Sequence, residues 1–160
     1  MRRIVLGLVS GALMLGILAG PVAAAGGSQT IAQIASGTGV HKTLVAALAC
    51  TDLIPAVSGK GQLTVFAPTD AAFAKLNLNE ANVCSIPKAD LANILKYHVA
   101  RGERLSGDVL GSSQIRMLNK QFAAVNASAL TIDGAQINAG LIDIRASNGV
   151  IHVLNDVMLP

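Results

Sequence analysis

The sequence contains few aromatic residues, little charge and only two cysteines. Its 160 residues include no tryptophan, one tyrosine and three phenylalanines, and 13% are charged. The net charge is +3 and, after Arg2-Arg3, the basic residues occur singly, so we expect no basic patch and no nucleic-acid partner. Hydrophobic residues make up 52% of the chain, which excludes an intrinsically disordered protein. The length indicates one domain.

Long apolar runs are also missing, except at the N-terminus. There Arg2 and Arg3 precede an uncharged apolar segment, residues 4–20, and small alanines follow at positions 23–25. This order predicts a secretory signal peptide, residues 1–25, with an uncleaved anchor helix as the alternative. Its removal leaves ten basic residues against nine acidic ones, a net charge of +1. We therefore expect an exported chain, periplasmic or extracellular, with no membrane span in its mature form.

The predicted export of the chain bears on the state of its two cysteines, Cys50 and Cys84. An oxidising environment favours a disulfide between them, and two buried free thiols are the alternative. Closing a loop of this length stabilises a fold by roughly 3–4 kcal/mol in the chain-entropy model. Their spacing fits neither a metal site nor a CxxC redox motif.

The hydrophobic period divides the mature chain into two halves. Helical spacing of apolar residues predicts helices within residues 31–37, 40–48 and 87–97, and an apolar run predicts a buried strand at 63–67. After residue 97 the period changes to two, which is typical of strands. Helices followed by antiparallel strands indicate the α+β class.

Two hairpins are predicted in the second half, with turns at Asp133-Gly134 and Asn148-Gly149. If Ser147 faces Val150 across the second turn, one face of the hairpin consists of apolar residues and belongs to the core. The members of that face are Ile142, Ile144, Ala146, Ile151 and Val153. The opposite face then gathers Asp143, Arg145 and His152.

Three segments together resemble the fasciclin-like (FAS1) domain family. Residues 63–73, LTVFAPTDAAF, are similar to its first signature block, and residues 95–99, LKYHV, to its central Tyr-His segment. Residues 148–160, NGVIHVLNDVMLP, are similar to the closing block, in which Asn155 replaces the usual Asp. Order and spacing also fit, and the resemblance covers residues 28–160. The sequence is thus identified as a member with one domain, residues 26–160, of the secreted bacterial type.

This resemblance implies a fold and a general role. The fold is an antiparallel β-wedge or sandwich of two sheets with helices packed along it. The role is extracellular adhesion through proteins or carbohydrates. In some animal members the Tyr-His segment is assigned to integrin recognition, which makes Tyr97 and His98 the candidate binding residues here. The alternative for His98 is a buried ring that hydrogen-bonds to the backbone.

The remaining motif residues have structural interpretations. Thr69 stands where a helix N-cap belongs, with Asp70 in the first turn. His152 lies with Asp143 and Arg145 in a trio that could form an active site, although a solvated strand face is the commoner explanation.

Neither a metal site nor a catalytic site is predicted. The three histidines, His41, His98 and His152, are far apart and have no cluster of cysteines or carboxylates beside them, so we expect no metal and no cofactor. The sequence has no G-x-S-x-G nucleophile elbow. It therefore favours a secreted, non-enzymatic module that binds a cell-surface or matrix protein or polysaccharide. The alternatives are a carrier of a small apolar, pigment-like ligand and, third, a hydrolase of envelope polymers.

Overall fold

The computed structural model describes residues 28–160, so the predicted signal peptide lies outside the described residues. The first half is mainly helical. Its elements are α1 (Ile31–Gly37), α2 (Lys42–Cys50), α3 (Ile54–Ser58), β1 (Leu63–Pro68), α4 (Asp70–Ala74), the 3-10 helix η1 (Val83–Ser85) and α5 (Lys88–Tyr97). The predicted helices and strand of this half are confirmed. Val40 is an exception to the predicted buried stripe, because α2 begins at Lys42 and Val40 is 44% exposed.

The second half is mainly strands. Its elements are β2 (Val99–Arg101), α6 (Ser106–Leu110), β3 (Gln114–Arg116), β4 (Phe122–Asn126), β5 (Thr131–Ile132), β6 (Ala135–Gln136), β7 (Ile144–Ala146) and β8 (Gly149–Leu154). The turn at Asp133-Gly134 forms as predicted, because Ile132 pairs with Ala135 and both turn residues have positive φ.

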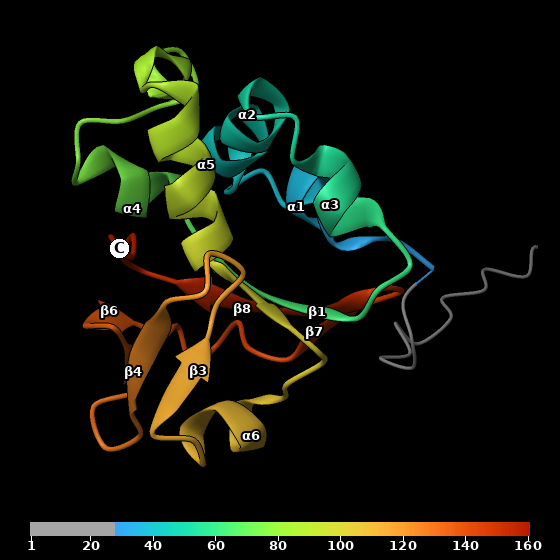
Figure 1. Ribbon diagram of the computed structural model, residues 1–160, viewed down its shortest axis with the longest axis vertical. Helices are drawn as coiled ribbons and strands as arrows, with labels where there is room; N and C mark the ends of the chain where they lie inside the picture. The colour runs from blue at the N-terminus through green and yellow to red at the C-terminus, as the bar shows by residue number, and fades with distance from the viewer. Residues whose placement is uncertain (1–27) are drawn as a thin grey trace, which may run out of the picture.

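These strands form two four-stranded sheets that meet as a wedge. One has the order β2-β1-β8-β7 and the other the order β3-β4-β5-β6. Single bridges, Ala100 to Met117 and Ile137 to Leu154, join the two sheets. Helices α1 to α5 gather on one side of the β1–β8 pair, whereas β3, β4 and α6 lie on the other (Figure 1). The α+β class and the expected wedge of two sheets with helices packed along it are confirmed.

One pairing departs from the expected antiparallel wedge. The central strands β1 and β8 are parallel, with Leu63 beside Gly149 and Pro68 beside Leu154. Every residue of both strands is buried. Strands covered on both faces consist of near-continuous apolar runs, as in parallel sheets, and residues 63–68 and 149–154 have this composition.

The second hairpin has the predicted faces but a different register. Ala146 pairs with Gly149 and Arg145 with Val150, so the two-residue turn is Ser147-Asn148 and not Asn148-Gly149. The pairing of Gly149 with Leu63 in β1 explains this shift, because it makes Gly149 the first residue of β8. The turn moves by one residue, which shifts the pairing by two and leaves Ile144, Ala146 and Ile151 together on their predicted face. The prediction is wrong for Ile142, which packs in the second core and lines a cavity with His152, since the positive φ of Asp143 interrupts the alternation of the strand.

Two hydrophobic cores result from this arrangement. The first lies between the helices and the β1–β8 sheet and includes Leu44, Phe73, Leu95 and Ile151. The second lies between the two sheets and is built from side chains such as Phe66, Ile115, Ile132, Leu154 and Met158. No helix within residues 28–160 is long and apolar enough to cross a membrane.

Candidate functional site

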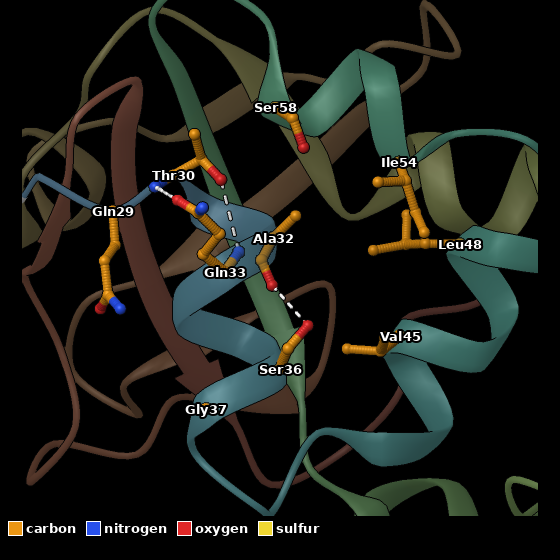
Figure 2. Close-up of a pocket in the computed structure, with 10 residues that line it drawn as sticks. All are labelled: Gln29, Thr30, Ala32, Gln33, Ser36, Gly37, Val45, Leu48, Ile54 and Ser58. Carbon is orange, nitrogen blue, oxygen red and sulfur yellow. Dashed lines mark hydrogen bonds between the residues drawn. The ribbon is translucent and has the colours of Figure 1, made fainter.

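An open groove on the helical side is the largest hollow described on the surface. It has a volume of about 630 Å³ and lies between α1, α2 and α3. Figure 2 shows Val45, Leu48 and Ile54 on one side of it, facing Ala32 and Ser36 of α1. Ile54 is 36% exposed, which is high for a large apolar side chain. The groove therefore combines an apolar wall with the polar face of a neighbouring helix.

Local hydrogen bonds fix the polar wall. The N–H of Gln33 donates to Thr30 Oγ1 at 3.4 Å, and the N–H of Thr30 donates to Gln33 Oε1 at 2.8 Å, which forms a capping box (Figure 2). The Ser36 hydroxyl donates to the carbonyl of Ala32 at 2.8 Å. The residues around the groove carry no formal charge. Its surface suits an uncharged partner segment with apolar and amide groups.

Sequence reasoning missed this groove. Its walls come from three consecutive helices, and the sequence pattern of each helix does not say at which angle it packs against the next. The one local signal was the Thr30-x-x-Gln33 spacing, which is a capping-box pattern and indicates where α1 begins.

Tyr97 and His98, the predicted binding residues, are buried. Tyr97 is 4% exposed and His98 is 1% exposed. The Tyr97 hydroxyl donates to the carbonyl of Phe122 at 3.4 Å. Burial, together with the nearby Asp133 carboxylate, raises the pKa of Tyr97 to about 12. Their burial argues against direct contact with a partner and for the structural alternative.

His98 links the end of α5 to the C-terminal segment. Its Nδ1 lies 2.8 Å from the carbonyl of Ile94, and its Nε2 accepts the N–H of Met158 at 2.9 Å. A carbonyl only accepts, so Nδ1 carries the hydrogen and Nε2 offers its lone pair. Burial lowers the pKa of His98 to about 4, although the bond to Ile94 acts in the opposite direction. The ring is therefore neutral at physiological pH.

Thr69 and Asp70 connect two helices. Thr69 is the N-cap of α4, and its hydroxyl accepts the N–H of Ala72 at 3.2 Å. The Asp70 carboxylate accepts the N–H of Thr43, in the first turn of α2, at 2.8 Å. Burial acts to raise the pKa of Asp70, but the hydrogen bonds from Thr43 outweigh it and lower the pKa. Asp70 thus supplies the cap that α2 lacks from its own preceding residue, His41.

A serine, an aspartate and a histidine meet beneath α6. The Ser106 hydroxyl donates to Asp143 Oδ2 at 2.6 Å, and the Ser106 N–H donates to Asp143 Oδ1 at 2.7 Å. The N–H of Asp143 donates to His152 Nδ1 at 3.3 Å, and His152 Nε2 donates to the carbonyl of Arg104 at 2.8 Å. Sequence reasoning placed His152 near Asp143 but did not foresee Ser106 in this cluster. The expectation of a solvated strand face is wrong for His152, which is 1% exposed because the second layer of the fold covers β8 on this side.

The cluster lacks the order of a hydrolytic triad. In a triad the histidine accepts the serine proton, whereas here Ser106 donates to Asp143 and both nitrogens of His152 are occupied by backbone groups. Burial lowers the pKa of His152, against the opposing influences of the Arg104 carbonyl and Asp143. Burial acts to raise the pKa of Asp143, but the bonds from Ser106 outweigh it and lower the pKa. These contacts hold loops together and present no activated nucleophile.

Cys50 and Cys84 form the predicted disulfide, with Cα atoms 5.8 Å apart. It joins the end of α2 to η1. The three histidines remain apart, and within the described residues no group of three or more His, Cys, Asp or Glu side chains could hold a metal ion.

Comparison with known proteins agrees with this architecture. The family model of the Fasciclin domain matches residues 39–160. The chain belongs to the fasciclin-domain family. A structure of a FAS1 domain pair from the insect cell adhesion molecule Fasciclin I shares the fold with a TM-score of 0.63 at 15% identity, over 84% of this chain. This chain spans about half of that structure, 52%.

Several curated proteins share this fasciclin domain. Protein sll1483 of Synechocystis is 37% identical over 147 residues, which cover 86% of this chain and 77% of that protein. The pig transforming growth factor-beta-induced protein ig-h3 is 33% identical over 82% of this chain, which spans only 19% of ig-h3. The immunogenic protein MPB70 of Mycobacterium bovis is 27% identical over 88% of this chain and 75% of its own length.

Proposed function

We propose that this protein is an exported, non-enzymatic binding module that attaches to a protein or polysaccharide at a cell surface or in a matrix. The single observation that carries the proposal is the fasciclin-domain match over residues 39–160. A structural neighbour with the same fold is an insect cell adhesion molecule. The N-terminal sequence, with its basic start and apolar run, supports export.

The chemistry of the interior supports binding over catalysis. In the Ser106–Asp143–His152 cluster, the serine hydroxyl and both ring nitrogens of the histidine are engaged in structural hydrogen bonds. The proposal of a pigment carrier finds no comparable support, because the two enclosed apolar cavities described have volumes of about 30 and 10 Å³. A cavity of that size holds a water molecule or less.

The groove between α1, α2 and α3 is the surface we assign to partner contact. Its apolar wall loses contact with water when a partner covers it, and the neighbouring helix offers polar groups for hydrogen bonds. Ser36 is an exposed residue at the edge of this groove. A long charged side chain at Ser36 blocks the groove without disturbing the core.

A deletion and complementation experiment in the host organism tests the proposal. We expect deletion of the gene to reduce attachment and biofilm formation, and the unaltered gene to restore them. Ser36→Arg is expected to fail in restoring attachment. The matched control is Ala89→Arg, which adds the same charge on an exposed residue of α5 away from the groove.

Two outcomes contradict the proposal at different levels. Unchanged attachment after deletion, with export of the protein verified, contradicts the adhesion function itself. Full restoration by Ser36→Arg at normal protein levels contradicts only the assignment of the groove. Circular dichroism of both purified variants checks that they are folded.

A further inference from the structure

A second surface pocket is lined by positively charged side chains. It has a volume of about 390 Å³, within the range of small-molecule sites. Its lining consists of Arg101, Arg104, Arg116, Met117, Leu118 and Lys120. The lining contains four basic side chains and no acidic one. The expectation that the basic residues form no patch is therefore wrong, because the fold brings together residues that stand singly in the sequence.

Strand pairing places two of these arginines side by side. Ala100 pairs with Met117 in an antiparallel bridge, which makes Arg101 the cross-strand neighbour of Arg116. Like charges in this position repel each other and destabilise a sheet unless an anion lies between them. Neither arginine has a carboxylate partner within 4.0 Å among residues 28–160.

An exposed aromatic ring extends this row. Phe122 pairs with Arg116 across β3 and β4, so its side chain lies on the same face of the sheet. Phe122 is 54% exposed, whereas the other two phenylalanines, Phe66 and Phe73, are at most 1% exposed. An aromatic ring left in water next to a pair of arginines offers an apolar, electron-rich face beside a cationic one.

The third arginine of the pocket, Arg104, has a fixed backbone. Its N–H donates to Thr64 Oγ1 at 2.8 Å, and its carbonyl accepts from His152 Nε2 at 2.8 Å. Thr64 and His152 are both at most 1% exposed. The guanidinium Nε of Arg104 is buried and has no hydrogen-bond partner within the described residues. A buried donor without a partner is costly, and a bound acceptor relieves that cost.

The nearest carboxylates are already engaged elsewhere. Glu103 pairs with Arg145 at 3.2 Å and does not line the pocket, although it lines a neighbouring hollow that shares Arg101 and Arg104 with it. Asp108 accepts the N–H of Leu105 at 3.2 Å, in the first turn of α6. Neither carboxylate forms an ion pair within 4.0 Å with a basic residue of the pocket among residues 28–160.

We propose that this basic pocket binds the carboxylate or sulfate groups of an acidic polysaccharide. The planar guanidinium groups of Arg101 and Arg116 match such anions with paired hydrogen bonds. Phe122, which is 54% exposed, and the half-buried Leu118 supply apolar surface for the C–H face of a sugar ring. A single-stranded nucleic acid fits less well, because it needs several aromatic rings for successive bases and only Phe122 is available here. This inference rests on the proposed binding function, and it adds the basic pocket to the groove as a second binding surface.

A binding assay with defined polymers tests the pocket. Protein purified after expression of the full chain is titrated with polygalacturonate, dextran sulfate, uncharged dextran and single-stranded DNA. We expect both acidic polysaccharides to bind, with affinity that falls as salt is added, and uncharged dextran not to bind. Arg101→Gln/Arg116→Gln is expected to lose about tenfold or more in affinity, since hydrogen bonds to charged groups are the strong ones. Phe122→Ala is expected to weaken binding further without changing the salt dependence.

The matched control is Lys42→Gln/Lys88→Gln, which removes two charges from exposed residues at the starts of α2 and α5. We expect its affinity to equal that of the unaltered protein. Equal losses in both double variants overturn the pocket, since net charge then explains the binding. An absence of polysaccharide binding, or stronger binding of single-stranded DNA through the same arginines, overturns the ligand class. Thermal unfolding of each variant verifies that it is folded.

Two separate measurements, polysaccharide binding and attachment of cells, distinguish a failure of the pocket assignment from a failure of the proposed function. If Arg101→Gln/Arg116→Gln restores attachment in the deletion strain and the protein binds no acidic polysaccharide, the adhesion function stands and the pocket assignment falls. If the polysaccharides bind through the pocket but the deletion strain attaches normally, the pocket stands and the adhesion function falls.

Discussion

At the scale of single residues, the histidines show how burial replaces an expected surface role by a structural one. His98 sits between the carbonyl of Ile94 and the N–H of Met158, and one ring nitrogen serves each partner. This arrangement requires the neutral ring, because a second ring hydrogen would point at the N–H of Met158. His98 therefore ties α5 to the C-terminal segment only while it is unprotonated.

This requirement predicts a loss of stability in mild acid. Burial lowers the pKa of His98 in the folded protein to about 4, below the ordinary value of 6.5, so the unfolded chain binds the proton more readily. The contribution is complete above pH 6.5, falls as the pH drops toward 4 and amounts to about 3 kcal/mol. Urea unfolding between pH 4 and 8 measures it. In His98→Gln this part of the pH dependence should disappear, and an unchanged pH profile in that variant would contradict the assignment.

Gly149 gives a second prediction at this scale. A Cβ on Gly149 would lie 1.8 Å from the carbonyl oxygen of Leu63, and its φ is +151°. The parallel pairing of β1 and β8 leaves no room for any side chain there, so we expect Gly149→Ala to destabilise the fold by about 3 kcal/mol or more. Thermal unfolding measures the change.

The matched control for this substitution is Gly37→Ala. Gly37 is the last residue of α1, and an added Cβ there has nothing within 4 Å. Its melting temperature should stay the same or rise slightly, because alanine favours helices. Similar losses in both variants would show that the close approach to Leu63 is not the cause.

At the scale of elements, the helical layer depends on links between neighbouring segments. The Asp70 carboxylate caps α2 from the start of α4, and the Cys50–Cys84 disulfide joins the end of α2 to η1. Helix α2 has nine residues, which is too short for stability on its own. Both of its ends are therefore fixed by residues that lie more than 25 positions later in the chain.

Removal of the disulfide should weaken the whole fold. The two cysteines are 34 residues apart, and for a loop of this length the chain-entropy model gives about 4 kcal/mol. We expect Cys50→Ala/Cys84→Ala to unfold at a lower urea concentration, by an amount similar to that caused by a reductant on the unaltered protein. The reductant should have no effect on the double variant. A reductant-insensitive midpoint in the unaltered protein would exclude the bridge.

At the scale of the whole molecule, the two proposed binding surfaces differ in charge. The groove between α1, α2 and α3 has an uncharged lining, whereas the pocket between β2 and β3 has a cationic one. The accessible surface that lines each of them is much smaller than the area of about 800 Å² that one partner contributes to a typical stable interface, so one copy should bind weakly. If the protein acts in adhesion as proposed, we expect attachment to depend on many copies acting together.

This predicts a strong effect of valency. Beads densely coated with the protein should adhere to the target surface at least on the order of a hundredfold more tightly than soluble single copies. Retention of coated beads under flow, compared with surface plasmon resonance of soluble protein, measures the difference. Equal affinities of the two forms would mean that one domain is sufficient for attachment.

The sequence by itself determined much of the local structure. The Thr69 cap, the turn at Asp133-Gly134 and the helix that ends at Tyr97 follow from residues close together in the chain. Such signals are short-range, because caps and turns involve neighbours within a few positions. The order and spacing of the three fasciclin blocks indicated the fold class.

Only the tertiary structure decided the long-range pairings and the surfaces they create. The parallel contact of β1 and β8 set the register of the last hairpin, which local turn chemistry placed one residue too late. Packing of distant segments buried Tyr97 and His98 and brought Arg101 beside Arg116. The physical reason is that hydrophobic burial is non-directional and sums over the whole chain, so one-dimensional patterns do not specify which distant faces meet.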